Sequence, residues 1–229
     1  MTRADAPIGV FDSGVGGLTV VRALRAQLPN ESLIYVGDTA RVPYGPKSPE
    51  TVRLYATQIA EWLRGQQVKA IVVACNTATA HALTHLREML PIPVVGVIEP
   101  GARAAALATR GGPIGVIGTS GTIASGAYER AIHALAPTLL VHANACPLLV
   151  PMVEEGWADV LGPGVRLIDS AEETAVDTRR VLSAAGLLNP ALATPAHRFV
   201  VSDAPDRFLA LGRRFLDDTM AHVEHVDFS

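Results

Sequence analysis

Cys75 stands where an acid–base group or a nucleophile could act. It lies in the segment KAIVVACNTATA (69–80), whose apolar run 70–74 predicts a buried strand with a helix directly after it. Ligands of α/β proteins bind at the carboxyl ends of strands, and a helix N-terminus favours the thiolate form of a cysteine. Asn76 and Thr77 could bind an anion there. The alternative is a cysteine buried at the end of a core strand.

A glycine-rich loop follows the first predicted strand, 8–12. Its sequence, DSGVGG at 12–17, fits neither the dinucleotide-binding pattern nor the P-loop pattern, so nucleotide binding is unsupported. Asp12 could bind an ammonium group or orient a nearby thiol, and Ser13 could donate a hydrogen bond. A tight turn with a capping serine is the other interpretation.

A second loop, GDTARVPYG at 37–45, follows the next predicted strand and is expected at the same edge of the sheet. Tyr44 and Gly45 could present backbone N–H groups and a phenol to a carboxylate. An ordinary proline–glycine turn is the alternative.

Two other groups of residues have simpler interpretations. His81 and His85 have zinc-binding spacing, but Ala82 replaces the glutamate of the HExxH motif, so two solvent-facing histidines and no metal site are expected. Cys146 precedes a proline and an apolar run, which favours a packing role.

The composition excludes several classes of protein. Apolar residues make up 49% and charged residues 18% of the 229 residues, with a net charge of −3, so neither a disordered chain nor a nucleic-acid-binding surface is indicated. No apolar run reaches the roughly 20 residues that span a membrane, and the first residues lack a signal-peptide pattern, so a cytoplasmic protein is expected. Lys47 and Lys69 are the only lysines, which gives a pyridoxal-phosphate enzyme little support, and no cofactor is predicted.

Short apolar runs alternate with helical patterns throughout the chain, which predicts βα units and a mostly parallel sheet. The expected strands are 8–12, 33–37, 70–74, 94–98, 114–118, 139–143, 165–169 and 198–202. The expected helices are 18–28, 50–64, 76–89, 101–109, 122–135, 171–185 and 204–220.

A weak internal repeat predicts two related lobes. IGVFDSGVGGLTVVRAL at 8–24 resembles IGVIGTSGTIASGAYERAI at 114–132. We therefore expect two pseudo-symmetric, doubly wound α/β lobes with the active site between them. The first would comprise 1–97 plus about 182–229, and the second about 98–181.

The repeat also indicates that the second lobe is truncated. The second and fourth strands of the first half are 56 residues apart, from 37 to 93, whereas the matching interval from 143 to 164 is 21 residues. About 35 residues are absent, enough for a strand and its flanking helices. The second half therefore has no counterpart of AIVVACNT.

Taken together, the loop motifs resemble those of the glutamate racemase family. The matching strings are FDSGVGGLTV, GDTARVPYG, VVACNTATA, PVVGVIEPGA, GVIGTSGTIASGAY, ACPLLVPMVEEGW and LIDSAEETA. The resemblance implies a cofactor-independent amino-acid racemase that interconverts L- and D-glutamate and supplies D-glutamate for peptidoglycan. Members of this family are often dimers, so a homodimer is a further expectation.

In this family two cysteines stand on opposite faces of the glutamate α-carbon, and one thiolate removes a proton while the other thiol delivers one. The resemblance makes Cys75 one of the two. It implies that the substrate contacts are Asp12, Ser13, Tyr44, Gly45, Asn76 and Thr77. Thr119 and Thr122 match a contact loop of the second lobe, and Glu154 matches a carboxylate near the second cysteine.

The chain departs from the family at the second cysteine. The GCTH-type motif is absent, and the resemblance breaks near Trp157-Ala158, inside the interval that the repeat shows to be short. Three interpretations follow: a racemase with impaired activity, a related enzyme with one base such as a decarboxylase or isomerase, and a remnant that binds glutamate or a partner without catalysis.

Overall fold

A six-stranded parallel sheet forms the larger part of the molecule. The computed structural model describes residues 4–146, 168–191, 194–217 and 219–228. The strand order is β4-β3-β1-β2-β7-β8, so β1 lies between β2 and β3, where the order of the chain through the sheet reverses. The strands are β1 (Ile8–Asp12), β2 (Leu33–Gly37), β3 (Ala70–Val73), β4 (Val94–Gly96), β7 (His197–Val201) and β8 (Glu224–His225).

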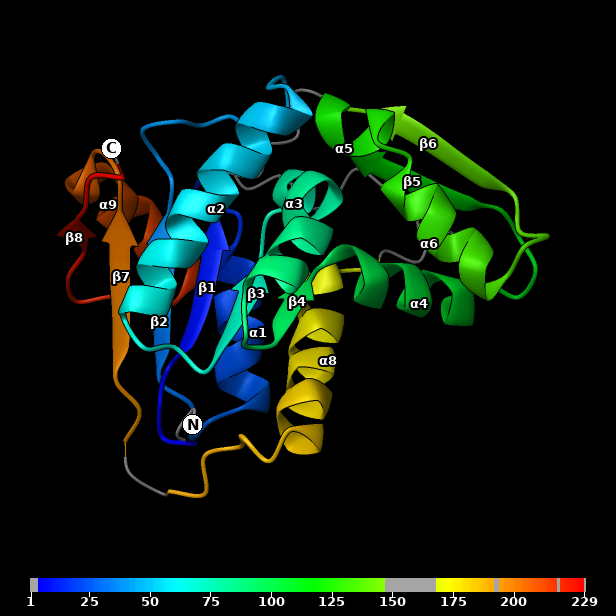
Figure 1. Cartoon of the computed structure of the whole chain (residues 1–229). Helices are drawn as coiled ribbons and strands as arrows, with labels where there is room; N and C mark the ends of the chain where they lie inside the picture. The colour runs from blue at the N-terminus through cyan, green and yellow to red at the C-terminus, as the bar shows by residue number, and fades with distance from the viewer. Residues whose placement is uncertain (1–3, 147–167, 192–193, 218, 229) are drawn as a thin grey trace.

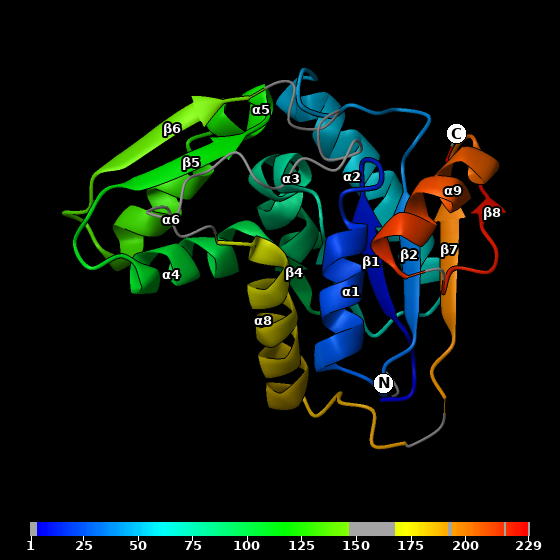
Figure 2. The same ribbon diagram turned by 180° about the vertical axis from the view of Figure 1, so that it is seen from behind.

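Helices cover both faces of this sheet, which is why its central strands β1, β2 and β3 are buried along their whole length. α2 (Pro49–Gly65) and α3 (Asn76–Met89) lie on the face seen in Figure 1. α1 (Leu18–Gln27), α8 (Ser170–Ala184) and α9 (Pro205–Phe215) lie on the other face, seen in Figure 2. Alternate strand residues enter different cores, because successive side chains of a strand point in opposite directions.

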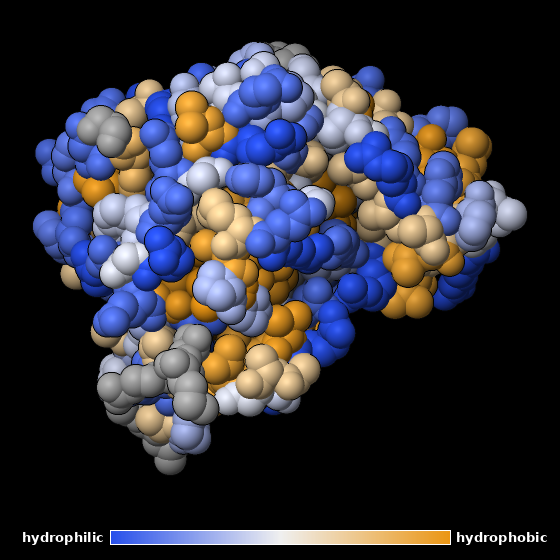
Figure 3. Space-filling view, in the orientation of Figure 1, coloured by the Kyte–Doolittle hydropathy of each residue, from blue (hydrophilic) through white to orange (hydrophobic). Residues whose placement is uncertain are grey.

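A second unit projects from the first sheet (Figure 1). It contains the parallel pair β5 (Ile114–Gly118) and β6 (Val141–Ala145), with α4 (Ile98–Ala108), α5 (Ser120–Ala124) and α6 (Ala127–Leu135). Its small core includes Ala102, Ile114, Val116 and Ile132. Burial alternates along β5, and Ile117 is 52% exposed. Figure 3 shows apolar surface near α4, and Leu107 near the end of α4 and Leu135 at the end of α6 are 81% and 54% exposed.

The predicted α/β class with a parallel sheet is confirmed, but several predicted boundaries are wrong. The apolar run 94–98 ends as a strand at Gly96, because Ile98 already begins α4. The helix predicted at 122–135 divides into α5 and α6 at Gly126, whose φ of 62° lies in the left-handed region. The strand predicted at 165–169 falls largely outside the described residues, and the two-residue β8 was not predicted.

The division into two lobes stays a prediction, and α8 bears on its boundary. The sequence assigns most of α8 to the second lobe. Its buried residues Ala171, Ala175 and Leu182 belong to the core of the first sheet, beside α1, and α8 also contacts α4. This helix therefore joins the two units.

A buried ion pair connects the amino ends of β2 and β3. Lys69 Nζ lies 2.5 Å from Glu31 Oε2, and both side chains are almost completely excluded from solvent. Nζ also donates to the carbonyl oxygen of Ala4, and Glu31 Oε1 accepts from the Asn189 N–H at 2.9 Å. The pair thus ties four segments together at the edge of the sheet opposite to the carboxyl ends.

We predict that Lys69→Met lowers the free energy of unfolding by about 3–5 kcal/mol, because it leaves Glu31 as an uncompensated buried charge. Urea denaturation measures this loss. Adding Glu31→Gln should recover much of it. The control Glu224→Gln breaks the exposed pair with Arg198 and should change the stability by no more than about 1 kcal/mol. Equal effects of the two single substitutions would contradict the prediction.

Candidate active site

The carboxyl ends of β1, β2 and β3 bring the predicted loops together. Asp12 pairs with Gly37, and Phe11 pairs with Val73, so the three strands end almost level. The loops after them carry Asp12 and Ser13, the 38–45 segment, and Cys75. This edge lies at the reversal of strand order, where open α/β sheets bind ligands.

Cys75 is the N-cap of α3. Its backbone is extended, and its Sγ accepts a hydrogen bond from the Ala78 N–H at 3.4 Å. The thiol donates to Ser13 Oγ at 3.6 Å, and the residue is 6% exposed. The structure therefore brings together Cys75 and Ser13, which are 62 residues apart in the sequence.

The glycine-rich loop wraps around the Asp12 carboxylate, which is 7% exposed. Asp12 Oδ2 accepts from the N–H groups of Gly17 at 3.0 Å and Gly14 at 3.1 Å. A Cβ at position 17 would lie 2.6 Å from Asp12 Cβ, so only glycine permits this approach. Tyr35 on β2 also holds this loop, because its hydroxyl donates a hydrogen bond to the Gly14 carbonyl at 2.8 Å.

Burial and charge determine the protonation of these two groups. Burial raises the pKa of Asp12, against the hydrogen bonds from Gly17 and Gly14. Burial, and then the negative charge of Asp12, raise the pKa of Cys75 to about 12, against the hydrogen bond from Ala78. The expectation that the start of α3 makes Cys75 a thiolate is therefore wrong, because the dipole and one N–H do not offset burial beside a carboxylate.

Asn76 and Thr77 contact the second unit. Thr77 Oγ1 lies 2.8 Å from Thr119 Oγ1 and 3.1 Å from Thr122 Oγ1, and these two hydroxyls lie 3.0 Å apart. Asn76 Oδ1 accepts from the Tyr128 hydroxyl at 2.8 Å. The first turn of α3 is thus held by α5 and α6, which agrees with the expected place of Thr119 and Thr122 near the site.

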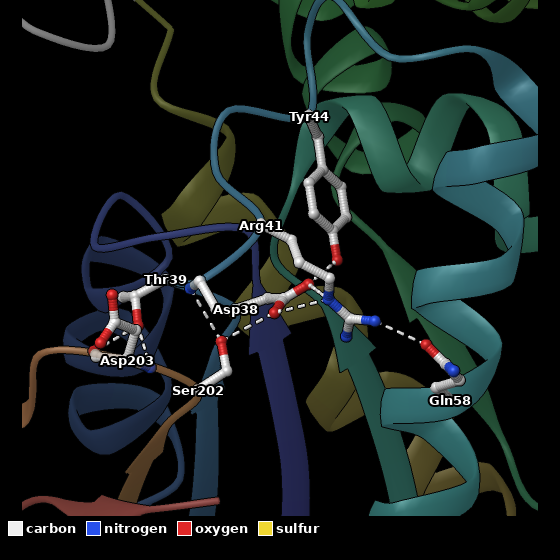
Figure 4. Close-up of polar contacts among 8 residues, drawn as sticks. Asp38, Thr39, Arg41, Tyr44, Gln58, Ser202 and Asp203 are labelled. Atoms are coloured by element: carbon white, nitrogen blue, oxygen red, sulfur yellow. Dashed lines mark hydrogen bonds and ion pairs between the residues drawn. The ribbon is translucent and has the colours of Figure 1, made fainter. Parts of the chain in front are cut away.

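Tyr44 and Gly45 adjoin the same turn, but the Tyr44 phenol points into the protein. Its hydroxyl donates to Asp38 Oδ2 at 2.5 Å (Figure 4). The Tyr44 hydroxyl therefore already donates within the protein, and contact of Tyr44 or of the backbone of this turn with a ligand carboxylate stays a prediction. Gly45 packs against Thr119, whose Cβ would lie 2.8 Å from a Cβ at position 45.

The remaining predictions have mixed outcomes. His81 is half-buried and its Nε2 donates to the Gly121 carbonyl at 3.2 Å, so it does not face solvent as expected. The thiol sulfur of Cys146 accepts a long contact of 3.8 Å from Asn144 at the end of β6.

The described residues contain no group of three metal-ligating side chains and no helix long and apolar enough to cross a membrane. Glu154 and the break at 157–158 lie outside the described residues.

A cavity of about 380 Å³ lies at the other end of the sheet, at the edge strands β7 and β8. None of the predicted site residues lines it. Its walls include Arg25, His197, Thr219 and Glu224. The chemistry is therefore assigned from the packed cluster around Cys75 rather than from this cavity.

Comparison with known proteins identifies the family. The model of the Asp/Glu/Hydantoin racemase family matches residues 18–161, more than half of the chain. The glutamate racemase of Geobacter metallireducens is 46% identical over 258 aligned positions, which cover 96% of each chain. That of Neisseria gonorrhoeae is 45% identical, again with 96% of each chain covered. The chain belongs to the glutamate racemase family. It is thus, by family, an amino-acid racemase, a class of isomerase.

Solved glutamate racemases have the same fold. The enzyme of Bacillus anthracis superimposes with a TM-score of 0.92 at 40% identity, and 98% of each chain is covered. The enzyme of Francisella tularensis in complex with D-glutamate gives 0.89 at 36% identity, with 99% of each chain covered. A small-molecule ligand is therefore the partner that these structures indicate.

The alignment to the Geobacter racemase supports the internal gap. It spans 258 positions but includes only about 220 residues of this chain, 96% of its 229 residues, so about 38 positions of the relative face a gap in this chain. These positions lie inside the aligned region. Their number is compatible with the segment of about 35 residues that the internal repeat shows to be absent.

Several residues of the site could not be found from the sequence. Tyr35 and Tyr128 fix the glycine-rich loop and Asn76, yet nothing in their local sequence distinguishes them from core tyrosines. Asp38 had a usable signal, since it follows β2 directly at the same edge as Asp12 and Cys75.

We predict that Cys75 reacts with iodoacetamide only at strongly alkaline pH, with a midpoint near 12, because its pKa is raised by burial and by Asp12. A Cys146→Ser background isolates this thiol, and mass spectrometry follows its alkylation. Asp12→Asn removes the nearby charge and should move the midpoint down. Since the unfolded thiol ionises near its ordinary pKa of about 8.5, stability should also fall as the pH rises from there toward 12. A midpoint near 9 that Asp12→Asn leaves unchanged would contradict this.

Proposed function

We propose that this chain binds glutamate beside Cys75 and moves its α-proton through that thiol without a cofactor. The observation that carries the proposal is the buried Cys75 thiol, held between Ser13 Oγ and the start of α3 and next to the Asp12 carboxylate. The family of the chain and the D-glutamate complex of the Francisella racemase support glutamate as the substrate.

The two raised pKa values suggest how the substrate itself activates the thiol. The α-ammonium group of glutamate placed beside Asp12 would compensate the negative charge that disfavours a Cys75 thiolate. The thiol would release its proton to solvent, and the resulting thiolate would take the α-proton, so that the Cα–H bond breaks, an S–H bond forms and the electron pair stays on Cα. The dipole at the start of α3 would stabilise the carbanion, and return of the proton would restore the amino acid.

We propose further that this transfer takes place on one face of the α-carbon only. Inversion needs a second acid on the opposite face, and the chain has no other cysteine than Cys146. That residue follows β6, with its N–H bonded to the Gly118 carbonyl. A single group tends to return the proton to the face from which it came. Supply of D-glutamate for peptidoglycan, the role typical of this family, would therefore be weak.

The single thiol also keeps the one-base alternative open, because one cysteine suffices to protonate a carbanion formed by decarboxylation. The glutamate-type loops favour exchange on glutamate over a new substrate. The remnant without catalysis differs from both in a measurable way, since it would bind glutamate and leave the α-proton in place. A homodimer and a cytoplasmic location remain predictions.

We predict that the protein exchanges the α-proton of L-glutamate for deuterium in deuterated water, observed as loss of the α-proton NMR signal. Cys75→Ser should lower this rate by about 10²–10⁴-fold, the usual contribution of a positioned acid–base group. Calorimetry should show that Cys75→Ser still binds glutamate. Cys146→Ser is the matched control and should exchange at the unaltered rate. Binding without Cys75-dependent exchange would favour the remnant, and absence of binding would refute the proposal.

A further inference from the structure

Asp38 is a buried carboxylate that the reaction scheme above does not use. Its side chain is 0% exposed. Its two oxygens accept from Arg41 Nε at 2.8 and 3.0 Å, from the Tyr44 hydroxyl at 2.5 Å and from Ser202 Oγ at 2.8 Å (Figure 4). Three side chains, from the loop itself and from the segment after β7, therefore donate to one anion. A buried carboxylate needs such donors to offset its loss of hydration.

Helix α2 fixes the cation of this cluster. Arg41 Nη1 donates to Gln58 Oε1 at 2.5 Å, and the guanidinium group lies 4.1 Å from the centroid of the Tyr55 ring. Gln58 and Tyr55 both belong to α2. The guanidinium plane thus has one orientation, and its Nε–H is aimed at Asp38.

The segment after β7 fixes the other side of the loop. Ser202 Oγ accepts from the Ala40 N–H at 2.9 Å while it donates to Asp38. Thr39 Oγ1 donates to the Asp203 carbonyl and accepts from the Asp203 N–H at 2.8 Å. The start of the 38–45 loop is therefore attached to a strand end 164 residues away in the sequence.

The same loop ends in the turn next to Cys75. Tyr44 joins Asp38 to Gly45, and the Gly45 carbonyl lies 2.6 Å from where a Cβ on Gly121 would be. Thr119 packs against Gly45 and bonds Thr77 in the first turn of α3. A shift of the Tyr44 ring would therefore move a turn that touches both units of the site.

We infer that Asp38 is a positioning residue that holds the Tyr44–Gly45 turn against α3 and the second unit and so sets the affinity for glutamate. This inference rests on the function proposed above. The negative charge matters because Arg41 and the two hydroxyls all donate to it, and an amide would turn an N–H₂ group toward at least one of them. Asp38→Asn keeps the volume and loses this arrangement.

Three measurements test the inference on the full chain. Hydrogen–deuterium exchange of the free protein should become faster across residues 39–47 in Asp38→Asn. Calorimetry should show glutamate affinity at least about tenfold weaker, the effect of losing one charge-assisted hydrogen bond. In the α-proton exchange assay the half-saturating glutamate concentration should rise by the same factor, while the rate at saturation stays within about twofold. A general loss of structure would lower the rate at saturation as well.

A milder variant and a matched control cover the case in which Asp38→Asn does not fold and the case in which any loss of a carboxylate has the same effect. Ser202→Ala removes one donor and keeps the charge, so it should also speed amide exchange across residues 39–47 and weaken glutamate affinity by about two- to tenfold. Glu224→Gln makes the same carboxylate-to-amide change in an exposed ion pair and should alter none of the three measurements. Should Asp38→Asn fail to fold, unchanged readouts in Ser202→Ala overturn the inference. If the unaltered chain binds glutamate and the Asp38→Asn measurements are unchanged, the positioning role of Asp38 is refuted but the proposed function is not. If the unaltered chain does not bind glutamate, both are refuted.

Discussion

The Asp12 carboxylate is the group around which the site is built. It shapes the glycine-rich loop by accepting the N–H groups of Gly14 and Gly17, and only glycine fits at position 17 beside it. Its negative charge also raises the pKa of Cys75. One interaction therefore sets both the backbone and the chemistry. A thiol that is protonated near neutral pH can become a base when a substrate ammonium group compensates that charge.

Much of the architecture could be predicted from the sequence because it follows from short-range patterns. Buried apolar runs gave β1, β2 and β3, and the helix after Cys75 begins and ends as predicted. Parallel strands then place Asp12, Ser13 and Cys75 at one edge, and the 3.6 Å contact between Cys75 and Ser13 agrees with that expectation.

What the sequence does not reveal depends on tertiary contacts or on the backbone conformation of single residues. The motif around Tyr44 does not show that Asp38, which also bonds Arg41 and Ser202, accepts the hydrogen bond of the Tyr44 hydroxyl. The helix dipole and the free N–H groups at the start of α3 favour a Cys75 thiolate, whereas burial, which raises the pKa of this thiol, cannot be inferred from the local sequence. Likewise, the division of one predicted helix into α5 and α6 depends on the backbone that Gly126 adopts.

We propose that a racemase scaffold with one thiol moves protons on a single face of glutamate. The internal repeat indicates that a segment is absent from the second half of the chain. The 258-position alignment indicates independently that residues are absent from the interior of the chain. The most direct test follows the circular dichroism of an L-glutamate solution during incubation with the purified protein. We predict that the signal persists while the α-proton exchanges. A decay of the signal to zero would reveal a second base and refute transfer on a single face.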